Sequence, residues 1–179
     1  MDTPKKIAIG WFSFSCCEDS TIVFTELMND HWQEWKRIFD FRHAKVLKDN
    51  NVMGPFDIAF VEGAIAAPEQ VKKLKLIRSL ATKLVAIGTC ACEGGFSAQR
   101  NTFNEEQKAA TDFLVEKFGA LPKVLKVSEV VTVDAAVPGC PMNTDIFLKA
   151  VSGLVAEMRP DLLPQPAPVA SEGSSESTR

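Results

Sequence analysis

Apolar runs that alternate with helix-length amphipathic stretches constrain the fold of this chain more than any other feature. The apolar runs have the length and continuity of strands buried on both faces, and they cover residues 6–14, 57–65, 83–89 and 127–137, with a weaker candidate at 41–47. Apolar residues recur every three or four positions in the stretches between them, as in amphipathic helices, at residues 21–39, 67–81, 104–118 and 143–158. The order predicts an α/β fold with a central parallel sheet between helices, joined by right-handed crossovers.

Residues at the predicted helix starts support these boundaries. Ser20, Asn104 and Asn143 carry short polar side chains that accept a hydrogen bond from a free amide at a helix N-terminus. Pro68 falls in the first turn of the second helix, where its missing amide costs nothing. We therefore expect four well-defined helices.

Composition changes sharply near residue 159. The segment before it, residues 1–158, has the apolar content of one domain with a single core. The segment after it, residues 159–179, is rich in proline and serine and has too few apolar residues to bury. We predict one folded domain followed by a disordered C-terminal tail.

Charge and hydropathy exclude several classes of partner. The formal net charge is -3, and acidic and basic residues are interleaved, so no basic stripe indicates binding to nucleic acid. Charged residues interrupt every apolar run before the roughly 20 residues needed to span a bilayer, which predicts no direct membrane insertion. The first residues lack the pattern of a secretory leader. We expect a cytoplasmic protein.

Five cysteines dominate the chemistry. Each lies just past the carboxyl end of a predicted strand: Cys16 and Cys17 after the first, Cys90 and Cys92 after the third, and Cys140 after the last. The carboxyl ends of parallel strands meet at one edge of a sheet, where loops run into helices and ligands bind. The thiols are therefore expected to converge.

Thiolates at such an edge suit iron better than the alternatives. Four of them satisfy the tetrahedral irons of a [4Fe-4S] cluster, and nearby glycines, Gly139 among them, let the backbone approach a bulky ligand. Structural zinc usually takes C-x₂₋₄-C pairs, a thioredoxin-like dithiol needs C-x-x-C, and a nucleophilic cysteine needs a base, for which only His31 and His43 exist. Any single cysteine also fits a small packed core position.

Four sequence blocks resemble those of a known family. They are WFSFSCCEDS at residues 11–20, VEGAI at 61–65, GTCACEGG at 88–95 and PGCP at 138–141. In this order they resemble small subunits of [NiFe]-hydrogenases and the related cluster subunit of complex I, over roughly residues 5–158. The resemblance implies a flavodoxin-like three-layer sandwich that holds one proximal [4Fe-4S] cluster beside a separate large subunit.

The resemblance also implies a ligand set. Cys17, Cys90 and Cys140 match family ligands motif by motif. Hydrogenase small subunits usually have C-x-G-C in the first block, which would place a cysteine where this chain has Phe14. The adjacent pair instead looks like the complex I subunit, so Cys16 is predicted as the fourth ligand, with Cys92 as its substitute.

Other residues are expected near the cluster without binding it. Glu18 and Glu62 are interpreted as helix caps or surface carboxylates, or else as a proton relay or an alternative iron ligand. Gly139 shapes the loop before the last cysteine, and Cys92 is a small residue packed beside the cluster. Since no cysteine follows Cys140, one cluster is expected, and no phosphate-cradling motif for a flavin follows the first strand.

Three functions follow, in order of preference. The first is the electron-transfer small subunit of a cytoplasmic [NiFe]-hydrogenase, bound to the large subunit and to further flavin or iron-sulfur subunits, and not catalytic alone. The second is the cluster subunit of a complex I-like quinone oxidoreductase, which the adjacent cysteines favour. The third is a cluster- or zinc-binding interaction module without redox turnover, which metal analysis distinguishes from the other two.

Overall fold

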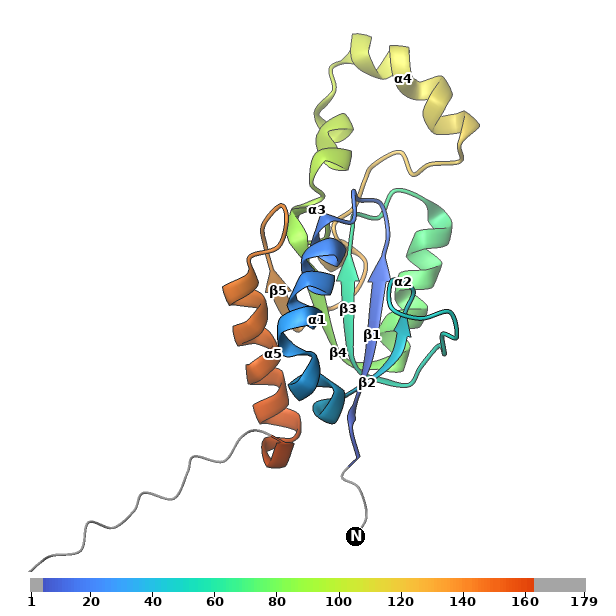
Figure 1. Cartoon of the computed structure of the whole chain (residues 1–179). Helices are drawn as coiled ribbons and strands as arrows, with labels where there is room; N and C mark the ends of the chain where they lie inside the picture. Colours follow the sequence, from blue (N-terminus) through green and yellow to red (C-terminus); the bar gives the residue numbers. More distant parts are fainter. Residues whose placement is uncertain (1–4, 163–179) are drawn as a thin grey trace, which may run out of the picture.

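The computed structural model describes residues 5–162 and contains one five-stranded sheet (Figure 1). All neighbouring strands are parallel, in the order β2-β1-β3-β4-β5. The strands are β1 Ile7–Ser13, β2 Phe39–Ala44, β3 Phe56–Glu62, β4 Ala81–Ile87 and β5 Ala135–Val137. This is the flavodoxin-like strand order, in which the chain adds strands on one side of β1 and then, from β3 onward, on the other side. The predicted α/β fold is confirmed.

Helices cover both faces of this sheet. The helices are α1 Asp19–Ile38, α2 Pro68–Leu80, α3 Gly88–Glu93, α4 Glu105–Lys117 and α5 Thr144–Met158, with 3₁₀ turns η1 Phe96–Thr102, η2 Val127–Glu129 and η3 Pro160–Leu162. α1 and α5 pack on one face and α2 on the other (Figure 1). Among residues 5–162, no helix combines the length and the apolar character that crossing a membrane requires.

Two hydrophobic cores lie back to back across the sheet. Successive side chains of a strand point to opposite faces, so Trp11 of β1 enters the core under α1 and α5, and Phe12 enters the core under α2. Trp11 stacks on Phe24 of α1 with ring centroids 4.2 Å apart, while Leu74 and Ile77 of α2 are fully buried on the other side. Burying each such side chain contributes about 1.5–3 kcal/mol.

Two of the predicted caps are confirmed, and one is wrong. Asn104 and Asn143 accept hydrogen bonds from backbone amides in the first turns of α4 and α5. α1 begins at Asp19, so Ser20 lies inside the helix. The Ser20 hydroxyl instead accepts a hydrogen bond from the backbone amide of Met142 at 3.2 Å.

The last predicted strand is much shorter than expected. Only Ala135–Val137 pair with β4, and the earlier part of the run forms η2 and irregular backbone. Asp134 marks the change, because its carboxylate accepts a hydrogen bond from the Leu84 amide at 2.8 Å, while its own amide donates to the Leu84 carbonyl at 2.9 Å. The valines before Asp134 cover the core under α2. This burial accounts for the apolar run, although these residues do not pair as a strand.

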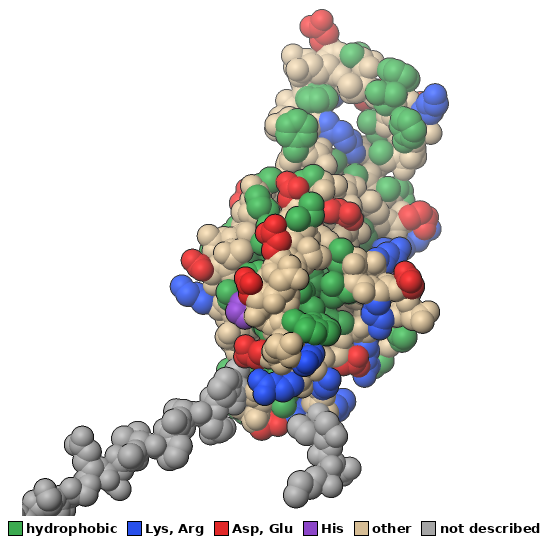
Figure 2. Space-filling model, viewed as in Figure 1, with side chains coloured by type: hydrophobic (Ala, Val, Ile, Leu, Met, Phe, Trp, Pro, Cys, Tyr) green, Lys and Arg blue, Asp and Glu red, His purple; other side chains and the backbone are tan. Residues whose placement is uncertain are grey.

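η1 and α4 form an arm beyond the carboxyl edge of the sheet, at the top of Figure 1. α4 has the amphipathic pattern of a packed helix, but it contains no buried residue. Phe96, Phe113 and Phe118 on this arm are 81%, 61% and 74% exposed, and Figure 2 shows hydrophobic side chains over the same part of the surface.

The structure describes the first four residues of the predicted tail. Of its residues, 159–162 are described: Arg159 caps the end of α5, Pro160–Leu162 form η3, and Leu162 packs against the core under α1 and α5. Arg159 forms an ion pair with Asp161 and donates a hydrogen bond to the Lys5 carbonyl. The prediction for residues 163–179 lies outside the described residues.

Candidate metal centre

Four of the five cysteines line one small pocket at the carboxyl edge of the sheet. Cys16 and Cys17 come from the loop between β1 and α1, Cys90 from α3 after β4, and Cys140 from the loop after β5. All five thiols are free of disulfides. Residues more than seventy positions apart in the sequence are thus brought together, as the predicted parallel sheet requires.

The pocket has a free volume of about 10 Å³, so the thiols nearly close it. Within the described residues, no three His, Cys, Asp or Glu side chains are close enough to hold one metal ion as they stand. A bulky cluster would therefore need some thiols to swing outward. Cys17 and Cys140 are exposed and have room to do so.

Burial and neighbouring groups disfavour thiolates in the absence of a cation. Burial, and next the Glu62 carboxylate, raise the pKa of Cys16 to about 12. Burial also raises the pKa of Cys90, and the nearby Cys17 and Cys140 thiolates raise it further. Cations held among these sulfurs would reverse both effects, because a thiolate ligand is stabilised by the metal that it binds.

Glu62 connects the sheet to the loop that carries the first two cysteines. It ends β3, is 3% exposed, and lines the same pocket. Its carboxylate accepts hydrogen bonds from the backbone amides of Ser20 and Thr21, both at 3.1 Å, and from the Thr21 hydroxyl at 2.6 Å. A carboxylate is favoured at a helix N-terminus, where amides lack partners. Glu62 therefore acts as the cap of α1.

Glu18 turns the chain from the cysteine loop into α1. Its φ of 65° lies in the left-handed region, which is uncommon for a residue other than glycine. Its carbonyl accepts the Ile22 amide at 3.1 Å and so starts the helix. Its side chain lines a different pocket, between α1 and α2, and not the cysteine pocket.

Two glycines allow the loops around Cys90 and Cys140 to approach each other. Gly88 and Gly139 have φ values of 77° and 118°, and a Cβ on Gly139 would lie 2.6 Å from the Pro141 carbonyl oxygen. The Thr89 amide donates to the Gly139 carbonyl at 2.8 Å, which joins the two loops directly. Gly139 therefore shapes the loop that carries Cys140.

Cys92 does not line the pocket that the other four cysteines share. It is on α3 with Cys90, but its thiol donates a weak hydrogen bond to the Ala86 carbonyl at 3.6 Å and packs against the core under α2. Burial raises its pKa, as expected of a thiol in apolar surroundings. The structure does not place it at the pocket as a substitute ligand.

Sequence reasoning missed Thr21. This residue accepts the indole N–H of Trp11 at 2.8 Å and donates to Glu62, so it links the core, the cap and the cysteine loop. A threonine in the first turn of the first helix was visible in the sequence. Its partner on β3 was not, because the two are 41 residues apart.

A parallel sheet of order β2-β1-β3-β4-β5, with four cysteines gathered at its carboxyl edge, defines a flavodoxin-like fold with a thiol-lined pocket. Residues 16–154 match the family described as NADH ubiquinone oxidoreductase, 20 Kd subunit. The chain belongs to this family of oxidoreductase subunits, and the predicted family resemblance is confirmed.

Two curated relatives that match the chain are hydrogenase subunits. The chain is 28% identical over 170 residues, 84% of its length, to a subunit of the F420-non-reducing hydrogenase of Methanothermobacter thermautotrophicus. It is 32% identical over 115 residues, 55% of its length, to the delta subunit of the NAD-reducing hydrogenase HoxS of Cupriavidus necator. The chain spans 54% of the length of each of these two relatives.

Solved structures agree with the fold. A chain of an NAD+-reducing [NiFe]-hydrogenase in the H2-reduced state superposes with a TM-score of 0.73 and 27% identity, covering 92% of this chain and 97% of that one. The Ni-Fe-Se hydrogenase from Desulfomicrobium baculatum, at 17% identity and a TM-score of 0.61, covers 90% of this chain and 66% of its own, and shows the fold alone.

Proposed function

We propose that this chain is the electron-transfer small subunit of a cytoplasmic [NiFe]-hydrogenase. It would hold one [4Fe-4S] cluster on Cys16, Cys17, Cys90 and Cys140, beside the nickel-iron site of a large subunit. The observation that carries the proposal is the convergence of these four thiols, from three separate loops, on one pocket. The donor set suits iron, because four cysteine thiolates are the usual ligands of such a cluster.

A bound cluster would supply reversible one-electron transfer, and the chain would supply its position. Cys16 and Cys90 are half-buried and fix one side of the site, while Cys17 and Cys140 are exposed. The exposed side is where a partner can approach within electron-transfer range. Glu62 and Thr21 fix the start of α1, which keeps the Cys16–Cys17 loop in place.

The relatives support the choice of partner. Those described above are subunits of hydrogenases, and one is named as NAD-reducing. Reduction of a soluble nicotinamide by such an assembly would require a flavin or iron-sulfur module beyond this chain, in the compartment that holds the nicotinamide. This supports the cytoplasmic location and the further electron-transfer subunits.

The test is metal analysis of the chain co-purified anaerobically with its partners. We expect about four irons and four acid-labile sulfides per chain, nickel in the partner, and a low-temperature EPR signal on reduction. Cys17→Ser and Cys140→Ser should each lose iron and the EPR signal, because each removes a ligand. Cys92→Ser is the matched control and should keep both.

Three outcomes would overturn parts of this proposal. Iron and sulfide without nickel would favour the quinone oxidoreductase subunit over the hydrogenase. Zinc in place of iron would refute the electron-transfer function. Loss of iron from Cys92→Ser comparable to the loss from Cys17→Ser would refute the ligand set.

A further inference from the structure

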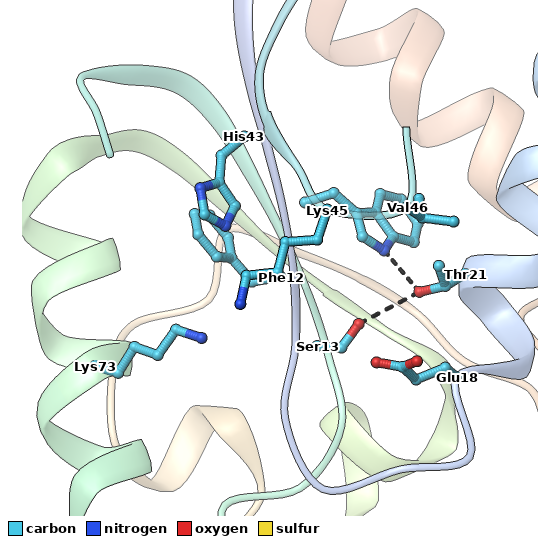
Figure 3. Close-up of a pocket in the computed structure, with 9 residues that line it drawn as sticks. Phe12, Ser13, Glu18, Thr21, His43, Lys45, Val46 and Lys73 are labelled. Carbon is cyan, nitrogen blue, oxygen red and sulfur yellow. Dashed lines mark hydrogen bonds between the residues drawn. The ribbon is translucent and has the colours of Figure 1, made fainter. Parts of the chain in front are cut away.

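A second pocket, of about 410 Å³, opens beside the sheet between α1 and α2 (Figure 3). Its walls come from the ends of β1 and β2 and from the two helices. His43 lies on β2, Lys45 directly follows that strand, and Lys73 lies on α2. None of the four proposed cluster ligands lines this pocket. Its volume falls within the range of small-molecule sites, about 300–1,000 Å³.

Two ammonium groups gather at one end of the pocket without a carboxylate partner. Figure 3 shows Lys45 and Lys73 reaching toward the same space, below His43. In the described part of the chain, neither lysine forms an ion pair, and the Lys73 ammonium lies 5.3 Å from the centre of the Phe14 ring. Burial, and next the charge of Lys45, lower the pKa of Lys73. An anion at this end would relieve the repulsion.

His43 adds a buried polar group to the same end. It is 8% exposed and stacks on Phe12, with ring centroids 4.5 Å apart. Its Nδ1 has no hydrogen-bond partner among residues 5–162, an omission that costs about 1–3 kcal/mol for a buried polar group. Burial, followed by the charges of Lys73, Lys45 and Lys48, lowers the pKa of His43, which favours the neutral imidazole beside the two ammonium groups.

The opposite end of the pocket accepts hydrogen bonds. Ser13, Glu18 and Thr21 line it (Figure 3). Thr21 is already engaged, because it accepts from the Trp11 indole and donates to Glu62. Ser13 has only a long contact to Thr21, at 3.4 Å, and the Glu18 side chain is not hydrogen-bonded within the described residues. These two groups are available to a ligand that carries hydrogen-bond donors.

We propose that this pocket binds a small molecule through a phosphoryl group held by Lys45 and Lys73, with the donor groups of the molecule directed toward Ser13 and Glu18. A phosphoryl group carries a charge of about -1.5 to -2 near neutral pH and three acceptor oxygens. The two ammonium groups of Lys45 and Lys73 match the charge of a phosphoryl group, whereas a single carboxylate would balance only one of the two ammonium groups. The site goes beyond the proposed electron-transfer function and does not depend on it.

The test uses the full chain, co-purified with its partners, and inorganic phosphate as the probe. Equilibrium dialysis with radiolabelled phosphate should show saturable binding. Lys45→Gln and Lys73→Gln should each weaken binding about tenfold, the loss expected from one charge-assisted hydrogen bond. Lys75→Gln is the matched control, because it removes the same charge from an exposed position on α2 outside the pocket, and it should bind as the unmodified chain does.

Each other outcome would overturn the proposal. Absence of saturable binding would refute the site. An equal loss in Lys75→Gln would show that general surface charge attracts the phosphate. Malonate that displaces phosphate and binds more tightly would refute the phosphoryl assignment in favour of a dicarboxylate ligand. Because Lys45 is exposed, its variant keeps the test valid if Lys73→Gln fails to fold.

Discussion

At the scale of single residues, Glu62 connects several parts of the candidate metal centre. Its carboxylate receives all of its hydrogen bonds from the first turn of α1, and it is almost fully buried. A charged group in such a place is stable only while its partners remain, because an unpaired buried charge is costly. The cap therefore contributes both to folding and to the position of the cysteine loop.

Glu62→Gln should lower the free energy of unfolding by about 2–3 kcal/mol, because charge-assisted hydrogen bonds become neutral and the amide NH₂ faces a backbone donor. Urea unfolding under anaerobic conditions measures the change. Glu69→Gln is the control: Glu69 forms an exposed ion pair with Lys72, and its loss should change stability little. Equal effects in the two variants would contradict the cap.

Residue types and local spacing predicted that the cysteines converge, but not which distant residues form hydrogen bonds around them. The position of each cysteine after a strand was enough to predict convergence at one edge, which the structure shows for four of the five. Cys92 separates because Cys90 and Cys92 lie on the short helix α3, which the sequence did not indicate, and two positions along a helix point to different sides. The sequence favours Ser20 as the cap because the carboxylate that caps α1 comes from a distant strand.

At the scale of elements, α4 and α5 differ in how they are held. Both show helical spacing and both have an asparagine cap. α5 buries Phe147, Val151, Leu154 and Val155 against the sheet, whereas α4 buries nothing. Most helical stability in proteins comes from packing of an apolar face, so α4 has only its cap and local hydrogen bonds.

Backbone amides of α4 should exchange with deuterium at least about tenfold faster than those of α5, since α4 opens locally and α5 only with the core. Hydrogen exchange with mass spectrometry on the chain free of partners compares peptides from residues 105–117 and 144–158. Equal protection of the two helices would contradict an unpacked arm. The pattern of α4 predicted its existence and length, but its exposure depends on what the rest of the chain leaves uncovered.

The sequence predicted strands well where both faces of the strand are buried. It predicted them poorly where one face of the strand is exposed. β1, β3 and β4 lie at the centre of the sheet and read as continuous apolar runs. The edge strand β5 has only three residues, and the run before it is apolar because it lies over a core. Apolar content alone does not distinguish a strand buried within the sheet from an irregular segment that covers a core.

At the scale of the whole molecule, one sheet belongs to two cores. Residues of β1, β3 and β4 alternate between the core under α1 and α5 and the core under α2. The order of strands and helices was sufficient to predict this arrangement, because parallel strands joined by helices have few other topologies. Two cores that share every central strand are expected to unfold together.

Ile77→Val and Phe147→Leu, one in each core, should each lower the free energy of unfolding by about 1 kcal/mol. Both side chains are almost fully buried, but the sheet separates them, so the double variant should show a single transition and the sum of the two losses to within about 0.5 kcal/mol. Urea unfolding followed by both circular dichroism and tryptophan fluorescence tests this. Ile22→Val, at a position that is 55% exposed on α1, is the control and should change little. Two separate transitions, with fluorescence sensitive to only one variant, would show that the helices on the two faces unfold independently.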